Sequence, residues 1–179
     1  MTVGSQQRAS KIAAFLDSTT PISTITSSRG FTTITGTYNN IPVSIVAIGM
    51  GPSMMDFFVR ETRAVVKGPI AIVRFGTCGG LAAEASAGVI AVATKGSGFV
   101  TRNPDAFVHR YGNENNNDDS FKNRYIMSKI APSEESLSNL VSSQLKEALG
   151  EEAVLEGANV TAESFYSSQG NIYIYLKYL

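Results

Sequence analysis

Short apolar segments alternate with amphipathic segments along this chain, and this alternation limits the possible folds more than any other feature. The runs at 70–73 (I-A-I-V) and 89–94 (V-I-A-V-A-T) are typical of strands in a sheet that is covered on both faces. Segments with helical spacing lie at residues 5–16, 52–66 and 133–149. Strands that alternate with helices predict an α/β fold with a mixed or parallel central sheet.

The sequence indicates both where the first helix starts and which of its residues form an apolar side. Thr2 and Val3 are typical of the end of a strand, and Ser5 is a candidate N-cap for the helix that follows. The spacing predicts an apolar side made of Ile12, Ala13, Phe15 and Leu16.

Turn residues indicate where several other elements begin and end. Residues 31–48 predict a β-hairpin that turns at Asn39 and Asn40. Pro52 suits a first helical turn because its missing N–H is not needed there. Gly150 is expected to end the third helix, and residues 154–162 are expected to form one further strand.

The bulk composition excludes several classes of protein. With 179 residues the chain has the length of one domain, and its 15 basic and 15 acidic side chains cancel. A neutral chain is a poor candidate for a nucleic-acid or polybasic membrane binder. One cysteine and one histidine, His109, are too few for common structural metal sites, so we expect no metal. Without a signal peptide or an apolar run long enough to span a bilayer, a soluble cytoplasmic protein is expected.

Three glycine-containing junctions are candidates for a binding site, because ligands of α/β sheets gather where strands end and helices begin. They are Gly4–Arg8, Gly49–Ser53 and Arg74–Gly80. At the first junction, free N–H groups at the helix start favour an anion, and Arg8 could reach back to it. An ordinary turn with a solvated arginine is the alternative.

Arg74 follows four apolar residues and must find a counter-charge or water. One possibility is an anion pocket that also uses the hydroxyl of Thr77. The other is an internal ion pair with a carboxylate such as Asp56 or Glu61. Nearby Cys78 is expected to pack as a small hydrophobic residue rather than to react, and His109 is expected to be solvated.

These motifs resemble the nucleoside phosphorylase family in their residues and in their order. The matching stretches are G-S-Q-Q-R, G-M-G-P-S and R-F-G-T-C-G-G, and S-F-Y-S-S-Q-G at 164–170 resembles the uridine phosphorylase branch. The resemblance implies a three-layer α/β/α fold with a central mixed sheet, covering residues 1–170 and incomplete at the C-terminus. It also implies phosphorolysis of a pyrimidine nucleoside, uridine, to free base and ribose 1-phosphate.

The resemblance further implies roles for individual residues. Inorganic phosphate would be a co-substrate and no cofactor would be needed. Arg29 would reach into the site of a neighbouring subunit, so the protein would be at least a homodimer. The phosphate would be bound by Gly4, Arg8, Arg29, Arg74 and Thr77, with Arg74 and Thr77 as the catalytic pair. The nucleoside would contact Thr77, Gly79, Phe165 and Gln169.

The match is interrupted near the end of the sequence. The family's base-binding arginine is expected at position 171, where this chain has Asn171, and residues 171–179 form an atypical tail. We therefore expect a chain that is truncated at both ends. The alternatives are a purine nucleoside phosphorylase or nucleosidase of the same family, or a weakly active relic that binds phosphate or nucleoside, or assembles with a full-length paralogue.

Overall fold

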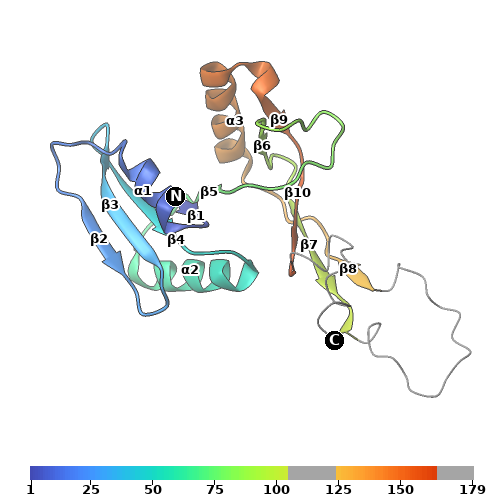
Figure 1. Cartoon of the computed structure of the whole chain (residues 1–179), viewed down its shortest axis with the longest axis horizontal. Coiled ribbons are helices and arrows are strands. Elements are labelled where there is room, and N and C mark those ends of the chain that lie inside the picture. Colours follow the sequence, from blue (N-terminus) through green and yellow to red (C-terminus); the bar gives the residue numbers. More distant parts are fainter. Residues whose placement is uncertain (105–123, 165–179) are drawn as a thin grey trace, which may run out of the picture. The chain divides into compact units, whose positions relative to one another are not determined.

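A computed structural model describes residues 1–104 and 124–164 of the chain. His109, Phe165, Gln169 and the tail 171–179 lie outside the described residues. The chain divides into two compact units, Met1–Gly79 and Gly80–Leu179, and each is described by itself below (Figure 1).

The first unit is built on a five-stranded mixed sheet with the strand order β2-β3-β4-β1-β5. Strand β3 is antiparallel to both β2 and β4, whereas β1 is parallel to both β4 and β5. Two helices accompany the sheet. The elements are β1 (Thr2–Val3), α1 (Gln6–Ala13), β2 (Ser23–Thr26), β3 (Thr32–Tyr38), β4 (Ile41–Ala47), α2 (Pro52–Val65) and β5 (Arg74–Phe75).

The two helices pack on opposite faces of this sheet, because successive side chains of β4 point in opposite directions. Ile45 belongs to a buried cluster with Ala9 of α1, whereas Val46 belongs to a second cluster with Phe58 of α2. The result is three layers, helix on sheet on helix (Figure 1). The predicted α/β/α fold with a mixed sheet is confirmed.

The predicted hairpin is also confirmed, since β3 and β4 pair over their whole length. Asn39 and Asn40 adopt positive φ angles of 49° and 63°, as a two-residue hairpin turn requires. The carboxylate of Asp17 accepts the backbone N–H groups of both asparagines, each at 3.0 Å, and the hydroxyl of Thr37 at 2.8 Å. Asp17 therefore caps the turn from a separate segment of the chain.

This cap predicts a pH-dependent contribution to stability. The Asn40 N–H, the Thr37 hydroxyl and then the Asn39 N–H hold the pKa of Asp17 below its ordinary value of 3.8. A carboxyl with a depressed pKa stabilises the fold above its unfolded pKa, and the stabilisation is lost as the pH falls through the folded pKa. We expect Asp17→Asn to lower the melting temperature at neutral pH, with a smaller difference from the unmodified protein in strong acid.

Thermal unfolding followed by circular dichroism at about pH 7 and about pH 2.5 measures this difference. Asp56→Asn is the matched control, because Asp56 is also exposed but, among the described residues, its carboxylate bonds only to Arg60 of its own helix. Equal melting temperatures of Asp17→Asn and the unmodified protein at both pH values would contradict the capping role.

The helix boundaries follow the predicted signals, with one exception. The hydroxyl of Ser5 accepts the backbone N–H of Arg8 at 3.3 Å, so Ser5 is the N-cap of α1. Pro52 occupies the first turn of α2. The helix α1, however, ends at Ala13, so Phe15 lies beyond it with 74% of its surface exposed. The prediction that Phe15 belongs to the apolar side of this helix is wrong, whereas Leu16, also beyond the end of α1, is 9% exposed and packs in the core.

Strand β5 differs from its prediction as well. Only Arg74 and Phe75 form ladder pairs, and β5 is an edge strand whose neighbour in the sheet is β1. Phe75 is 44% exposed, so the expected cover on both faces is not found within the first unit. An edge strand has a neighbour on one side only, which leaves it fewer packing partners than a central strand.

The second unit contains a three-stranded sheet, β10-β7-β8, and a parallel pair, β6-β9, against which α3 packs. Glu134 caps the start of α3, and Gly150 ends it at a φ of 96°, as predicted. The segment 154–162 forms two strands instead of one, because Gly157 and Ala158 interrupt it. The elements are β6 (Ile90–Val92), β7 (Ser97–Arg102), β8 (Tyr125–Met127), α3 (Glu135–Leu149), a 3-10 turn (Glu151–Ala153), β9 (Val154–Glu156) and β10 (Asn159–Ala162).

Candidate functional site: an arginine pair at the sheet edge

The three predicted junctions meet at one edge of the first sheet. Val3, the last residue of β1, pairs with Ala47 of β4 and with Phe75 of β5. All three strands run in the same direction, so they end at the same level (Figure 1). The chain then enters α1 after β1, α2 after β4, and the glycine-rich loop after β5. This edge is where ligands bind in open α/β sheets.

Gly4, Arg8 and Arg74 come together at this edge. A Cβ atom built on Gly4 would lie 3.7 Å from a guanidinium nitrogen of Arg74 and 3.8 Å from one of Arg8. The same point lies 3.8 Å from the carbonyl oxygen of Gly49. Because glycine has no side chain, Gly4 itself does not fill this point beside the two guanidinium groups.

A backbone carbonyl orients the Arg74 side chain. Nη2 of Arg74 donates a hydrogen bond of 2.9 Å to the carbonyl oxygen of Gly49. Burial, followed by the like charge of Arg8, lowers the pKa of Arg74 below its ordinary value. Two cations held this close repel each other, and an anion between them would relieve that repulsion.

The internal ion pair considered for Arg74 is not formed with either named carboxylate. Asp56 binds Arg60, with 3.2 Å between its Oδ1 and the arginine Nε. Glu61 binds Arg29, with 3.5 Å between its Oε1 and the arginine Nε. Within residues 1–104 and 124–164, no carboxylate forms a salt bridge with Arg8 or Arg74.

Arg29 contacts a different part of the first unit. Its guanidinium lies over the ring of Phe57, 4.5 Å from the centroid, and beside Glu61, and both contacts belong to α2. Its predicted role in the site of another subunit is neither supported nor contradicted by these contacts.

Thr77 and Gly79 lie in the exposed loop that follows β5. Thr77 comes two residues after the end of the strand, at the same edge as the arginine pair. Cys78, between them, is exposed as a free thiol, so the expected packing as a small hydrophobic residue is wrong. The loop after β5 offers little apolar surface within the first unit, and a side chain in it therefore stays in solvent.

Three contacts in and around the site were not predicted from the sequence. The Gly49 carbonyl holds Arg74, and Phe57 and Glu61 hold Arg29. The spacing of Phe57 and Glu61 could have indicated that both contact one partner, because residues four apart share one face of a helix. Nothing in the sequence indicates that Arg74 would bind a backbone carbonyl.

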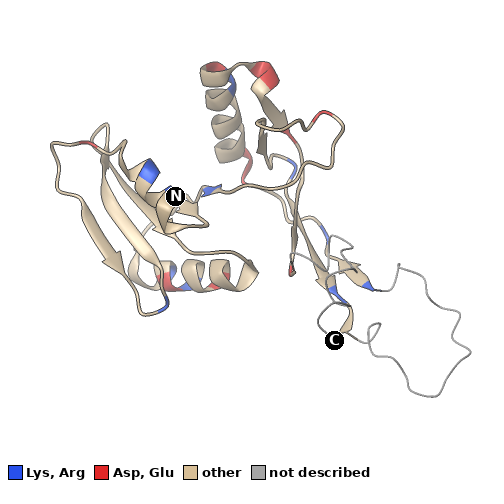
Figure 2. Ribbon diagram, in the orientation of Figure 1, with Lys and Arg blue, Asp and Glu red and all other residues tan. Residues whose placement is uncertain are grey.

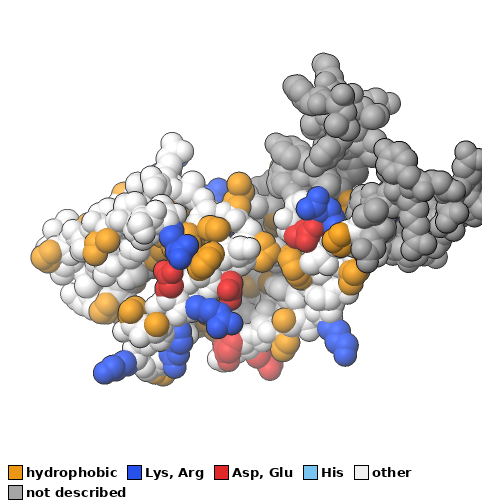
Figure 3. All heavy atoms as spheres, turned by 90° about the horizontal axis from the view of Figure 1, so that it is seen from below, with side chains coloured by type: hydrophobic (Ala, Val, Ile, Leu, Met, Phe, Trp, Pro, Cys, Tyr) orange, Lys and Arg blue, Asp and Glu red, His pale blue; other side chains and the backbone are white. Residues whose placement is uncertain are grey.

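Both signs of charge are spread over the molecule. Figure 2 shows basic residues on α1 and β5, and residues of both signs along α2. On the face in Figure 3, acidic and basic side chains lie next to one another with apolar side chains between them. In the part of the chain that the structure describes, no group of three metal-binding side chains occurs, and none of the helices has the length and apolar character to cross a bilayer.

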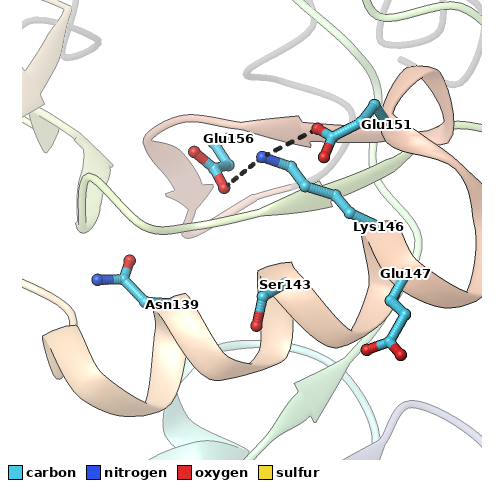
Figure 4. A pocket seen from close by; sticks show the side chains of 6 residues that line it. All are labelled: Asn139, Ser143, Lys146, Glu147, Glu151 and Glu156. Carbon is cyan, nitrogen blue, oxygen red and sulfur yellow. Dashed lines mark hydrogen bonds and ion pairs between the residues drawn. The ribbon is translucent and has the colours of Figure 1, made fainter.

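A shallow pocket in the second unit has a different character. It is lined by an ion-pair network in which Lys146 lies 2.9 Å from Glu156 and 3.6 Å from Glu151 (Figure 4). The hydroxyl of Ser142 and then Lys146 hold the pKa of Glu156 below its ordinary value. One lysine and three glutamates line this pocket, so its net charge is negative and, unlike the arginine pair, it would repel an anion.

Two arginines, an open glycine and a helix start define a site for a small, multiply charged anion. Arginine forms two parallel hydrogen bonds to phosphate oxygens and keeps its charge throughout the physiological pH range. The N-terminus of α1 adds free N–H groups and the positive end of its dipole. The Gly4–Arg8–Arg74 cluster on a mixed α/β sheet therefore has the charge and the geometry that suit a phosphate-sized anion.

Comparison with protein families identifies the class further. The sequence model of the phosphorylase superfamily matches residues 1–178. The chain belongs to this superfamily, within the nucleoside phosphorylases. Comparison with curated proteins gives no match.

Solved structures agree with this assignment. A uridine phosphorylase of the oomycete Phytophthora capsici is 43% identical, with a TM-score of 0.81, and is matched over 94% of this chain. The chain spans 60% of the length of that enzyme.

Two more distant structures share the fold. A nucleoside phosphorylase of Trypanosoma brucei, described as having uridine phosphorylase activity, is 19% identical with a TM-score of 0.64, over 94% of this chain and 64% of its own. A purine nucleoside phosphorylase of Toxoplasma gondii, solved with immucillin-H, is 18% identical with a TM-score of 0.58. The match covers 92% of this chain and 57% of that enzyme.

Proposed function

We propose that this chain provides the phosphate site of a pyrimidine nucleoside phosphorylase that cleaves uridine to uracil and ribose 1-phosphate. The observation that carries the proposal is the meeting of Gly4, Arg8 and Arg74 at the ends of three parallel strands. Two guanidinium groups without a carboxylate partner among the described residues fit a phosphate dianion better than a neutral ligand.

The proposed reaction requires positioning and charge rather than an enzyme nucleophile. A phosphate oxygen forms a bond to C1′ of the ribose while the bond from C1′ to the base nitrogen breaks, and its electron pair leaves with the base. Arg8 and Arg74 would hold the phosphate beneath C1′, where its negative charge stabilises the positive charge that develops on the sugar. Thr77 would contact both phosphate and ribose. No cofactor is needed for this step.

The choice of base is supported by the more similar relative. The Phytophthora capsici enzyme is a uridine phosphorylase at 43% identity, whereas the purine enzyme is 18% identical and shares the fold alone. Residues Phe165, Gln169 and Asn171 lie outside the described part of the chain. Gly79, Phe165 and Gln169 remain the proposed base contacts, with Asn171 where the family has an arginine.

The proposed assembly is a cytoplasmic homo-oligomer of at least two subunits. Arg29, whose described contacts are with Phe57 and Glu61 of α2, would complete the phosphate site of a neighbouring copy. A second subunit would thus add a third arginine to each phosphate.

Calorimetric titration with inorganic phosphate, together with release of base from uridine, thymidine and inosine, tests the proposal. We expect phosphate binding and a preference for uridine. Gly4→Ala is an informative variant, because its methyl group would lie 3.7 Å and 3.8 Å from guanidinium nitrogens of Arg74 and Arg8 without clashing with the backbone. It should weaken phosphate binding, whereas Gly157→Ala, which meets open space, should not. Absence of phosphate binding by the unmodified chain would refute the proposal.

A further inference from the structure

The loop that carries Arg29 is fixed by its own backbone. Ser27 donates its N–H to the carbonyl of Phe31 at 2.8 Å, and Gly30 donates to the carbonyl of Ser27 at 2.9 Å. Gly30 has a φ of 82°, a conformation that glycine adopts easily. Phe31 is 8% exposed and packs in the same cluster as Phe58 of α2. The base of the Arg29 side chain is therefore held at α2.

Two residues of α2 then determine where the guanidinium lies. Phe57 and Glu61 are four residues apart, so they share one face of the helix. The guanidinium carbon of Arg29 lies over the ring of Phe57, and Glu61 lies beside Nε. This leaves the edge with the two terminal nitrogens, Nη1 and Nη2, without a hydrogen bond among the residues that the structure describes. That edge is the fork by which arginine binds phosphate.

We propose that Glu61 and Phe57 are positioning residues that hold the Arg29 fork ready for the phosphate of a neighbouring subunit. The inference rests on the proposed function, because it requires that Arg29 reaches a phosphate. Both side chains of the ion pair are more than half exposed, at 56% and 58%. A pair this exposed contributes little to stability, so its main effect is to reduce the freedom that Arg29 loses on binding.

The negative charge of Glu61 and its proposed positioning of Arg29 predict opposite effects on phosphate binding when Glu61 is removed. By charge alone, loss of a carboxylate beside an arginine strengthens the binding of an anion. By position, Glu61→Ala weakens phosphate binding by roughly two- to tenfold, since Arg29 must then be ordered at the moment of binding. Asp56→Ala is the matched control, because it removes the same charge from an exposed ion pair on the same helix. It should leave phosphate affinity unchanged or slightly increased.

The ring of Phe57 gives an independent comparison. Phe57→Leu removes the aromatic face and should weaken phosphate binding, whereas Phe57→Tyr keeps that face and should restore it. In Phe57→Leu the KM for phosphate is expected to change more than the KM for uridine, and in Phe57→Tyr both are expected to stay close to those of the unmodified protein. Circular dichroism confirms that α2 remains folded.

A double-mutant cycle with Arg29→Ala decides between positioning and a general structural role. Phosphate affinity of the full chain is measured by calorimetry in the four variants of the cycle. If Glu61 acts through Arg29, Glu61→Ala has no further effect once Arg29 is alanine. An equal loss in both backgrounds, or unchanged binding in Glu61→Ala, overturns the positioning role while the proposed function stands. If the unmodified chain binds no phosphate, both are overturned.

Discussion

Arg74→Ala is expected to weaken phosphate binding by about 2 to 4 kcal/mol, or roughly 30- to 1,000-fold. The variant removes a two-pronged, charge-assisted contact from the centre of the site. Arg74→Lys keeps the positive charge but loses the planar fork, so an intermediate loss is expected. Calorimetric titration with inorganic phosphate measures both values.

The stability of the fold should respond differently. Removal of Arg74 breaks the hydrogen bond to Gly49 but also ends the repulsion from Arg8. We therefore expect a melting temperature close to that of the unmodified protein. Arg60→Ala is the control, since Arg60 is an exposed arginine paired with Asp56 on α2. If Arg74→Ala bound phosphate as tightly as Arg60→Ala, the phosphate site would have to lie elsewhere.

Ile45→Ala is expected to have the largest effect on stability, a loss of about 2 to 5 kcal/mol in the free energy of unfolding. Ile45 is 1% exposed, lies in the middle of β4 and packs in the cluster between the sheet and α1. Alanine would leave a cavity against neighbours that include Val3 and Ala9. Urea denaturation followed by circular dichroism measures the loss.

Ile41→Ala provides the comparison within the same strand. Ile41 is 64% exposed, so the same truncation there should change stability by no more than about 0.5 kcal/mol. Since Ile45 precedes Val46, which pairs with Thr2, the Ile45 variant should also loosen β1 and weaken phosphate binding. Similar losses in the two variants would show that the core is not where the buried cluster places it.

Much of the first unit could be predicted because its local signals are strong. Asn39 and Asn40 accept positive φ angles, Ser5 has the side chain of an N-cap, and Pro52 suits only a first helical turn. Each signal involves neighbours in the sequence. The role of Asp17 at the hairpin turn could not be predicted in the same way, because its partners are some twenty residues away.

Predictions that depended on tertiary packing were less successful. The apolar run before Arg74 has the pattern of a covered strand, yet β5 is a short edge strand whose Phe75 is partly exposed. Phe15 continues the apolar pattern of α1 but lies after its end. Apolar periodicity indicates which side chains can be buried, but contacts from distant segments determine which of them are buried.

For the candidate site, the three junctions could be identified from glycine and arginine spacing, and parallel strands explain why they meet. The partners of each arginine could not be identified. Arg74 donates a hydrogen bond to a backbone carbonyl. Arg29 forms an ion pair with Glu61, which was one of the predicted partners of Arg74. An ion pair depends on the positions of side-chain ends, which composition and spacing do not determine.

Strand β1, which is as short as β5, has a consequence for how the protein folds. β1 consists of Thr2 and Val3, and it is hydrogen-bonded to segments that begin far along the chain, at Val46 and at Arg74. Long loops must close before these contacts form, so strand β1 is expected to join the sheet late. The anion pocket exists only after that step. A bound phosphate would then stabilise the finished sheet over its precursors, coupling ligand concentration to the completion of folding.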